Sequence, residues 1–547
     1  MNNEMLLARR RILFAKQGGE TPGMVLLINS PNTGNFSVTT NYGAFTAAKV
    51  SEYPYLGTTV TRKLSISGVT FSTGQRLSDD SAVRGLFVGV ESWGTSNPYT
   101  NTSSLFYACT SLRGIPSSWE GLGELTDASD MFYDCTHLTS IPAWWTGLGG
   151  LTDATQMFFR CAFTSIPSSW AGLGALTNST RMVAGCTSLE SIPASWEGLG
   201  ALTDASGMVA GCTSLTSIPS SWEGLANVTS ASYMFSSCTS LTSIPASWAG
   251  LASLNDASNM FWSCAFTSIP SSWEGLANVT RASYMFSDCA SLESIPASWE
   301  GLASLNVAFS MFQGCTSLTS IPSSWEGLAT VTVAFSMFQG CTSLTSIPES
   351  WEGLGALDNA SGMFQACTSL SSIPESWAGL ASLTNAQNMF QSCTSLTSIP
   401  SSWEGFGTVS YAMAMFSDCT SLTSIPESWE GLERLVVASS MFQGCTSLTS
   451  IPDSWEGLGT LALSGLADVS AMFQGCTSLS NCGTIFTDLA KATDVSYLFD
   501  GCTAMQGDIH ALYVYLSTKP IAVTAFEGCF RGCTQAVGYD LIPASWK

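Results

Sequence analysis

The nineteen cysteines are the residues of this sequence with the most obvious chemistry, because thiolates bind metals, form disulfides and act as nucleophiles. Fourteen of them, from Cys109 to Cys445, follow one another at intervals of 26 residues, with two intervals of 25. A zinc site needs close ligand pairs such as Cys-x-x-Cys, whereas each repeat supplies one cysteine. Disulfides would need a pairing rule that near-identical repeats do not provide. The spacing therefore predicts a column of small buried thiols, and free thiols favour folding in a reducing compartment.

The last five cysteines break this period. They are Cys476, Cys482, Cys502, Cys529 and Cys533. Cys529 and Cys533, in the stretch CFRGC, are close enough in sequence to form a disulfide or to share a metal ion. The sequence leaves both of these alternatives open beside a pair of buried thiols.

Tryptophan and glutamate recur with the same rhythm. Fourteen Trp run from Trp119 to Trp455, and a Glu follows ten of them. A row of exposed indoles would form a platform for sugar rings, whereas a row of buried indoles would fill the interior. A column of carboxylates could bind Ca²⁺ or could simply keep an apolar chain soluble. Because few ligands would match fourteen repeats, we expect the Trp to be packed inside and the Glu to be solvated.

Residues that change between repeats are better candidates for ligand contact. They are aromatic residues outside the regular columns and acidic residues that follow Ile-Pro late in the array. The candidates are Trp144, Trp262, Tyr107, Tyr133, Tyr233, Tyr284, Tyr411, Glu349, Glu375, Glu427 and Asp453.

Composition argues against catalysis and against nucleic-acid binding. The formal charge is −22, and residues 101–475 carry five Lys or Arg against 28 Asp or Glu. Nucleic-acid binding needs a basic surface instead. The two histidines have no partner set, and no nucleophile-elbow, zinc-protease or phosphate-loop motif occurs. We therefore expect a non-enzymatic protein with no catalytic, cofactor-binding or metal-binding residues.

The elements that carry these residues must form a repeat. The consensus is MFxxCTSLTSIPxSWEGLxxLTxAS. SLTSIP is β-prone and ends at a proline, while AxxMF places apolar residues at i, i+3 and i+4, which is typical of a helical turn. One such unit cannot bury its own apolar face, so neighbouring units must stack. The pattern predicts an α/β repeat solenoid over residues 103–476, with a parallel sheet and short helical turns.

The phrases MFxGCTSLTSIP and FxxCxSL resemble the leucine-rich repeats of BspA-like surface and adhesion proteins, over about residues 103–506. This resemblance implies a right-handed leucine-rich-repeat coil. It also implies a role in adhesion or in contact with a host surface. The sequence departs from the family pattern where Pro-Ser-Ser-Trp replaces a second aliphatic residue, so we expect the Trp to supply the missing bulk.

The two ends differ from the array. Residues 1–23 read as a basic helix and a linker, with Arg9, Arg10 and Arg11 as candidates for docking to a larger assembly. Residues 24–102 alternate apolar and polar residues, which predicts a small β-rich domain that also caps the first coil. Residues 477–547 are predicted to hold degenerate coils, a helix around GDIHALYVYLSTKP and a C-terminal cap.

Two functional hypotheses follow. No secretory signal and no apolar stretch of membrane-spanning length occurs in the sequence, so we expect no membrane insertion. The first hypothesis is a phage virion component: a tail or head fibre, a decoration protein or a receptor-binding protein. It would contact other virion proteins through the N-terminal segment and a host glycan or protein through the solenoid. The alternative is an extracellular adhesin on a bacterial surface, and an intracellular scaffold is a third reading. A homo-oligomer also stays open.

Overall fold

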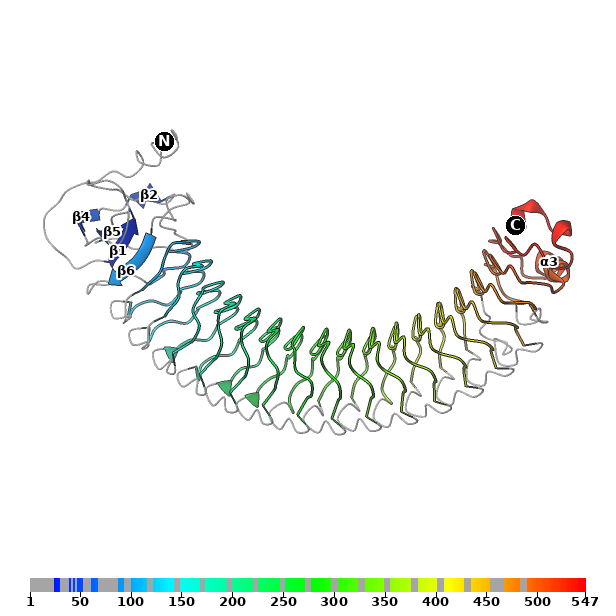
Figure 1. The fold of residues 1–547 in the computed structure, drawn as a ribbon, viewed down its shortest axis with the longest axis horizontal. Helices are drawn as coiled ribbons and strands as arrows, with labels where there is room; N and C mark the ends of the chain where they lie inside the picture. Colours follow the sequence, from blue (N-terminus) through cyan, green and yellow to red (C-terminus); the bar gives the residue numbers. More distant parts are fainter. Residues whose placement is uncertain are drawn as a thin grey trace, which may run out of the picture. The chain divides into compact units, whose positions relative to one another are not determined.

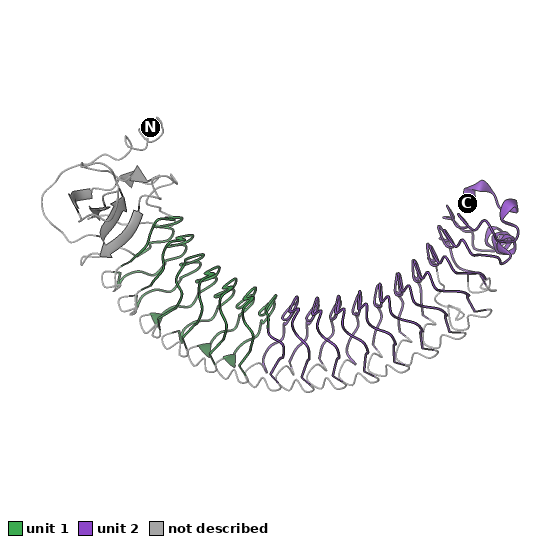
Figure 2. Cartoon of the chain, in the orientation of Figure 1, with its two compact units in different colours: residues 1–265, 274–276 green, residues 266–273, 277–547 purple. Residues whose placement is uncertain are grey.

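The computed structural model describes the strands of the N-terminal region and most of each repeat. The described residues are 24–29, 39–40, 43–44, 47–52, 61–66, 87–92, 100–115, 122–141, 148–167, 173–193, 199–219, 225–245, 251–270, 277–296, 304–322, 330–348, 355–374, 382–400, 408–426, 434–452, 467–482 and 489–547. The chain divides into two compact units (Figure 2). Unit 1 is Met1–Ala265 with Glu274–Leu276, and unit 2 is Phe266–Trp273 with Ala277–Lys547.

The N-terminal region of unit 1 contains the β-strands that alternation predicted (Figure 1). They are β1 (Met24–Asn29), β2 (Thr39–Thr40), β3 (Gly43–Ala44), β4 (Ala47–Glu52), β5 (Thr61–Ile66) and β6 (Phe87–Ser92). Four of them form an antiparallel sheet in the order β4-β5-β1-β6, and β2 pairs with β3. The predicted basic helix and linker of residues 1–23, with their arginines, lie outside the described residues.

The repeat units stack side by side in each unit, which confirms the predicted repeat solenoid (Figure 1). Along one flank, each coil pairs with the next through a single parallel bridge, such as Asp127 with Asp153. A second ladder runs through the SLTS segments, where the amide of Glu190 donates to the carbonyl oxygen of Thr164 at 3.0 Å. Neighbouring coils are thus joined by isolated parallel bridges and single hydrogen bonds, and the described repeats contain no strand of a continuous sheet.

The predicted helical turn at AxxMF is wrong. Residues 128–135 form successive tight turns, in which the amides of Met131 and Cys135 donate to carbonyl oxygens three residues earlier. The amides of Asp130 and Phe132 instead donate to carbonyl oxygens of the next coil, at 2.8 Å each. Asp130 and Asp134 have φ of +56° and +59°, as the third residue of a type II turn requires. The amides are consumed by the neighbouring coil, so no helical i→i−4 ladder forms.

The core of both units consists of columns of identical side chains. Met, Phe, Cys and Leu recur at 0–3% exposure across the described coils, as the repeat pattern predicted. In unit 2 the phenylalanine column is stacked with nearly parallel rings, for example Phe312 on Phe338 with ring centroids 5.6 Å apart at an interplanar angle of 4°. Each coil therefore buries its apolar face only by contact with its neighbours.

The C-terminal end of unit 2 closes this column. Helix α3 (Ile509–Thr518) confirms the predicted helix and is followed by the short 3₁₀ helices η8 (Tyr539–Leu541) and η9 (Ala544–Trp546). Trp546 is 7% exposed and stacks on Phe526 with centroids 4.5 Å apart. The amide of Phe530 donates to the carbonyl oxygen of Trp546 at 2.9 Å, as it would to a further coil. The segment around Trp546 thus covers the open end of the stack of coils.

Candidate binding surface

The cysteine column is a hydrogen-bonded part of the interior. Through most of the column the thiol donates to a phenylalanine or valine carbonyl of the preceding coil, as Cys135 Sγ does to Phe106 O at 3.3 Å in unit 1 and Cys341 Sγ to Phe312 O at 3.2 Å in unit 2. All nineteen cysteines are buried and none forms a disulfide. The same Phe106 oxygen also accepts from the amide of Cys109, so both of its lone pairs are used. The repeated cysteine is therefore a small buried donor that joins neighbouring coils.

Burial also makes these thiols poor nucleophiles. It raises the pKa of Cys186, Cys238 and Cys341 to about 12, which keeps them protonated at neutral pH. Cys529 and Cys533, for which the sequence left a disulfide or a shared metal open, are both free buried thiols. Cys533 continues the column by donating to Phe499 O at 3.2 Å. Across the described ranges, no group of three or more His, Cys, Asp or Glu side chains could hold a metal ion.

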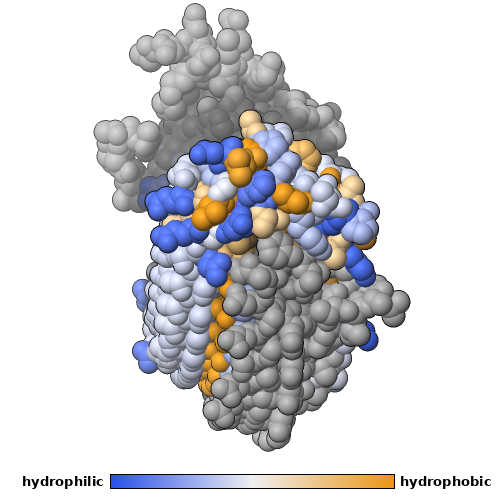
Figure 3. All heavy atoms as spheres, turned by 90° about the vertical axis from the view of Figure 1, so that its right-hand side faces the viewer, coloured by the Kyte–Doolittle hydropathy of each residue, from blue (hydrophilic) through white to orange (hydrophobic). Residues whose placement is uncertain are grey.

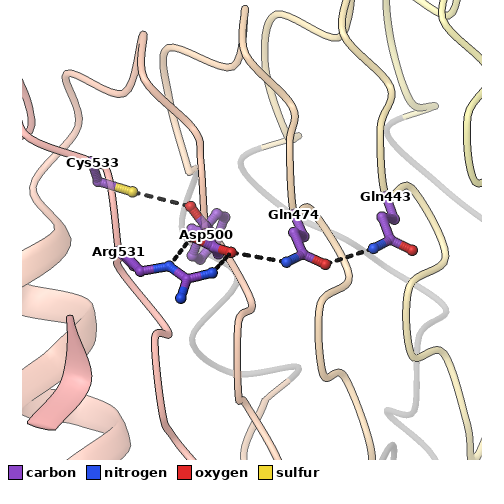
Figure 4. A network of polar contacts seen from close by, with 6 residues as sticks. Gln443, Gln474, Asp500, Arg531 and Cys533 are labelled. Carbon is purple, nitrogen blue, oxygen red and sulfur yellow. Dashed lines mark hydrogen bonds and ion pairs between the residues drawn. The ribbon is translucent and has the colours of Figure 1, made fainter.

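A second column consists of half-buried glutamine amides and ends in an ion pair (Figure 4). Gln443 Nε2 donates to Gln474 Oε1 at 2.6 Å, and Gln474 Nε2 donates to Asp500 Oδ2 at 2.8 Å. Arg531 donates through Nε to Oδ1 and through a terminal nitrogen to Oδ2 of Asp500, at 2.8 and 2.6 Å. Burial raises the pKa of the Asp500 carboxyl, but the hydrogen bonds from Arg531 and Gln474 outweigh it and hold the pKa below its usual value. This arrangement is the stable end of a ladder and leaves no free acid for chemistry.

The coils expose two kinds of polar surface. On one flank the Thr and Ser of SLTS are exposed beside an isoleucine with slight exposure, as in Thr319, Ser320 and Ile321 at 7%. Figure 3 shows rows of weakly hydrophilic residues and a narrow hydrophobic stripe on the coils. The other flank carries the bridged residues, which we call the cap column. Its members in unit 1 are Asn101, Asp127, Asp153, Asn178, Asp204, Ser230 and Asp256.

The Asp and Asn residues of the cap column fix the turn that follows them. Asp127 Oδ1 accepts from the amide of Ser129 at 2.9 Å and from its hydroxyl at 2.5 Å. The same bond to the residue two positions on recurs at Asp153 and Asn178. These side chains act as Asx caps, so a carboxylate or amide in this column has a structural role of its own.

The predicted ligand-facing residues behave differently from one another. Tyr133 lies between Tyr107 and Phe159, with centroids 4.6 Å from each, and the guanidinium of Arg160 lies 5.1 Å from the Phe159 ring centre. Burial and the neighbouring Tyr107 raise the pKa of Tyr133. Both faces of the Tyr133 ring are covered, so no sugar ring can stack on them.

Other predicted aromatic residues are open to solvent. In unit 1, Tyr233 is 46% exposed and Trp262 is 37% exposed; in unit 2, Tyr411 is 46% exposed. Tyr284 is half-buried, with its ring edge-on to Phe309 at 5.2 Å. Trp144, Glu349, Glu375, Glu427, Asp453 and the recurring Trp and Glu of SWEGL lie outside the described residues. The structure therefore keeps Tyr233, Trp262, Tyr284 and Tyr411 as surface candidates.

Sequence analysis missed a group of apolar residues in the cap column and in the position two residues further along the chain. They are Val307, Phe309, Val333, Phe335, Met413 and Val437. The signal was present in the repeat itself, because other coils place Asp or Asn and then Ser or Thr at the same two positions. Only the bridges of the structure show that Val307, Val333 and Val437 fall in one column with Tyr411.

No helix in the described part of the chain is both long and apolar enough to cross a bilayer. No curated protein matches the chain. One family model matches it repeatedly, at residues 82–196, 152–273, 177–299, 248–351, 335–455 and 453–535, and its description is "Mycoplasma protein of unknown function, DUF285". These overlapping matches begin just before β6, cover the whole array and end in the C-terminal cap. The chain belongs to the DUF285 family.

Proposed function

We propose that this chain is a non-enzymatic attachment protein whose coils present a binding surface on a stack of buried ladders. The observation that carries the proposal is that the recurring residues of each coil bond to neighbouring coils, while some of the variable residues are exposed. The thiols, the phenylalanines and the amides of the turn segment are bonded to neighbouring coils. Among the residues that change from coil to coil, Tyr233 and Trp262 are exposed. Aromatic side chains with exposed surface are the residues most suited to contact a host glycan or protein.

The first setting we propose is a phage particle, in which the chain is a tail or head fibre, a decoration protein or a receptor-binding protein. The strands β1 to β6 precede the coils, and residues 1–23 include Arg9, Arg10 and Arg11. In this setting the N-terminal segment contacts other virion proteins and the coils face the host cell.

The alternative is an adhesin on a bacterial surface. The family description names a bacterial genus, which favours this setting. We interpret the repeat as a leucine-rich repeat of the BspA-like kind, with right-handed coils. The buried Leu columns and the parallel pairing between coils support this interpretation. Proteins with such repeats are used in adhesion, so the molecular role is the same in both settings.

Fractionation separates the two settings. Virus particles and washed cell envelopes from the same culture are purified, and their proteins are identified by mass spectrometry. Enrichment in particles supports the virion setting, and presence only in the envelope refutes it.

Attachment itself is tested with the isolated full chain on host cells and on a glycan array. We expect Trp262→Ala and Tyr233→Ala to weaken retention, because they remove exposed rings. Tyr133→Phe is the matched control, since that ring is enclosed by its neighbours and the change removes only a hydroxyl. Retention that is equal for all variants would contradict a role for the exposed aromatics.

A further inference from the structure

The cap column changes character within unit 2. From Arg281 its successive members are Val307, Val333, Asn359, Asn385, Tyr411, Val437 and Asp468, each bridged directly to the next, and the column then continues to Asp494 and Ala525. In unit 1 every member of the column is Asp, Asn or Ser. Between Arg281 and Asp468, four coils thus replace the polar cap by valine or tyrosine.

This replacement weakens the local structure. Asn359, Asn385 and Asp468 each accept a hydrogen bond from the amide two residues on, at 2.9, 3.0 and 3.0 Å. Valine and tyrosine at the equivalent positions have no oxygen that can accept this bond in the same way. Departures from a repeat's own rule that reduce stability are expected at functional sites.

The apolar side chains also remain partly exposed. Tyr411 and Met413 are 46% and 37% exposed, and Val307, Val333 and Val437 are half-buried. Two positions after the valines, Phe309 and Phe335 stack with centroids 4.8 Å apart and are themselves half-buried. Exposed apolar surface of this kind marks an interaction site.

The order of residues in the column identifies the partner. Counted outward from the bridge between Asn359 and Asn385, Val333 corresponds to Tyr411 and Val307 to Val437. The next pair outward is Arg281 and Asp468. Between Arg281 and Asp468, the column therefore has apolar residues at mirrored positions and a cation mirrored by an anion.

In the column two residues further on, Phe335 corresponds to Met413 and Ser361 to Gln387, whereas Phe309 corresponds to the buried Ser439. In a two-fold interface residue i contacts residue j of the partner and j contacts i, so a dyad at this centre would bring these complementary pairs together.

We infer that unit 2 docks onto a second copy of this chain, with the two cap columns antiparallel and the dyad between Asn359 and Asn385. Val333 of one copy lies against Tyr411 of the other, and Val307 against Val437. Arg281 and Asp468 form an ion pair at each end of the contact. Asp468 is suited to this, because the bonds from Ser470 use Oδ1 and leave Oδ2 for a guanidinium. This dimer does not depend on which ligand the protein binds.

A charge swap tests the register. The mass of the full-length protein is measured by sedimentation velocity over a range of concentrations, and we expect a dimer. Arg281→Asp and Asp468→Arg should each raise the dimer dissociation constant at least about tenfold, because each places like charges opposite one another. The combined variant should restore dimerisation, since it exchanges the two partners. Arg113→Asp, which changes an exposed arginine in the first coil of unit 1, is the control and should have no effect.

Crosslinking tests the direction. Every native cysteine is buried, so engineered surface thiols should react alone. Val333→Cys combined with Tyr411→Cys should give a covalent dimer on oxidation, whereas neither single substitution should. A crosslink by Val333→Cys alone would indicate a parallel contact and overturn the proposal.

A residue that the repeat uses in other coils provides the control for folding. Val333→Asn installs the residue found at Asn359, so it should restore the cap, raise the melting temperature of the monomer and weaken the dimer. A full-length chain that is monomeric at every concentration would refute the second copy as occupant and leave the patch to a different protein. A dimer that the charge reversals do not affect would equally refute this interface.

Discussion

The phenylalanine column offers the sharpest test of how the coils are held together. Phe338 is 0% exposed and lies between Phe312 and Phe364, with ring centroids 5.6 and 5.7 Å away and interplanar angles of 4° and 6°. Phe338→Ala should cost about 3–5 kcal/mol, the usual range for removing a buried aromatic side chain. Within this loss, each of the two ring contacts accounts for about 0.5–1.5 kcal/mol.

A valine at the same position should be tolerated better. Val183 and Val209 occupy this column in unit 1 and are also 0% exposed. Phe338→Val keeps two carbon groups that alanine lacks, so it should be about 1.5 kcal/mol more stable than Phe338→Ala. This variant separates the loss of apolar burial from the loss of ring stacking.

The assay is amide hydrogen exchange measured by mass spectrometry. Repeat stability is close to a sum of terms between neighbours, so the loss should be local. The amides of Phe312 and Phe338, which donate to Met337 and Met363 at 2.9 Å, should exchange faster. The amide of Phe442 should keep its protection. A loss below about 1 kcal/mol, or faster exchange spread evenly over unit 2, would refute a stack held by nearest-neighbour contacts.

Three further predictions concern the thiols, Asp500 and the C-terminal cap. All nineteen thiols should resist a thiol reagent in the native protein and react after denaturation, because all are buried; rapid labelling of several native thiols would contradict the ladder. The pKa of Asp500 is lower in the folded chain, so its contribution to stability is present above its ordinary pKa of about 4 and is lost as the pH falls through the lower folded value. Asp500→Asn should therefore reduce the acid dependence of thermal unfolding, and an unchanged pH profile would refute it. Trp546→Ala should cost about 3–5 kcal/mol and expose the ring of Phe530, which binding of a hydrophobic dye would detect; unchanged dye binding would argue against the cap.

Sequence reasoning was most successful where a residue type repeats. The period and the burial of Met, Phe, Cys and Leu were predicted correctly. Outside the repeats, the helix Ile509–Thr518 was also predicted correctly. It failed at AxxMF, because apolar residues at i, i+3 and i+4 face inward both in a helix and in successive tight turns. What decides between these structures is where the amides of residues such as Asp130 and Phe132 donate, and they donate to the next coil.

The sequence by itself determined that this protein is a stack of near-identical coils with buried thiols, because 26-residue periodicity leaves no other way to bury one apolar face per unit. The tertiary structure decided which residues of different coils share a column. The sequence alone makes Tyr133 a binding candidate, but in the structure aromatic rings cover both of its faces. The sequence alone does not relate Val333 to Tyr411, but the bridges between coils place both in one column. Such assignments depend on contacts between coils, which no single repeat encodes.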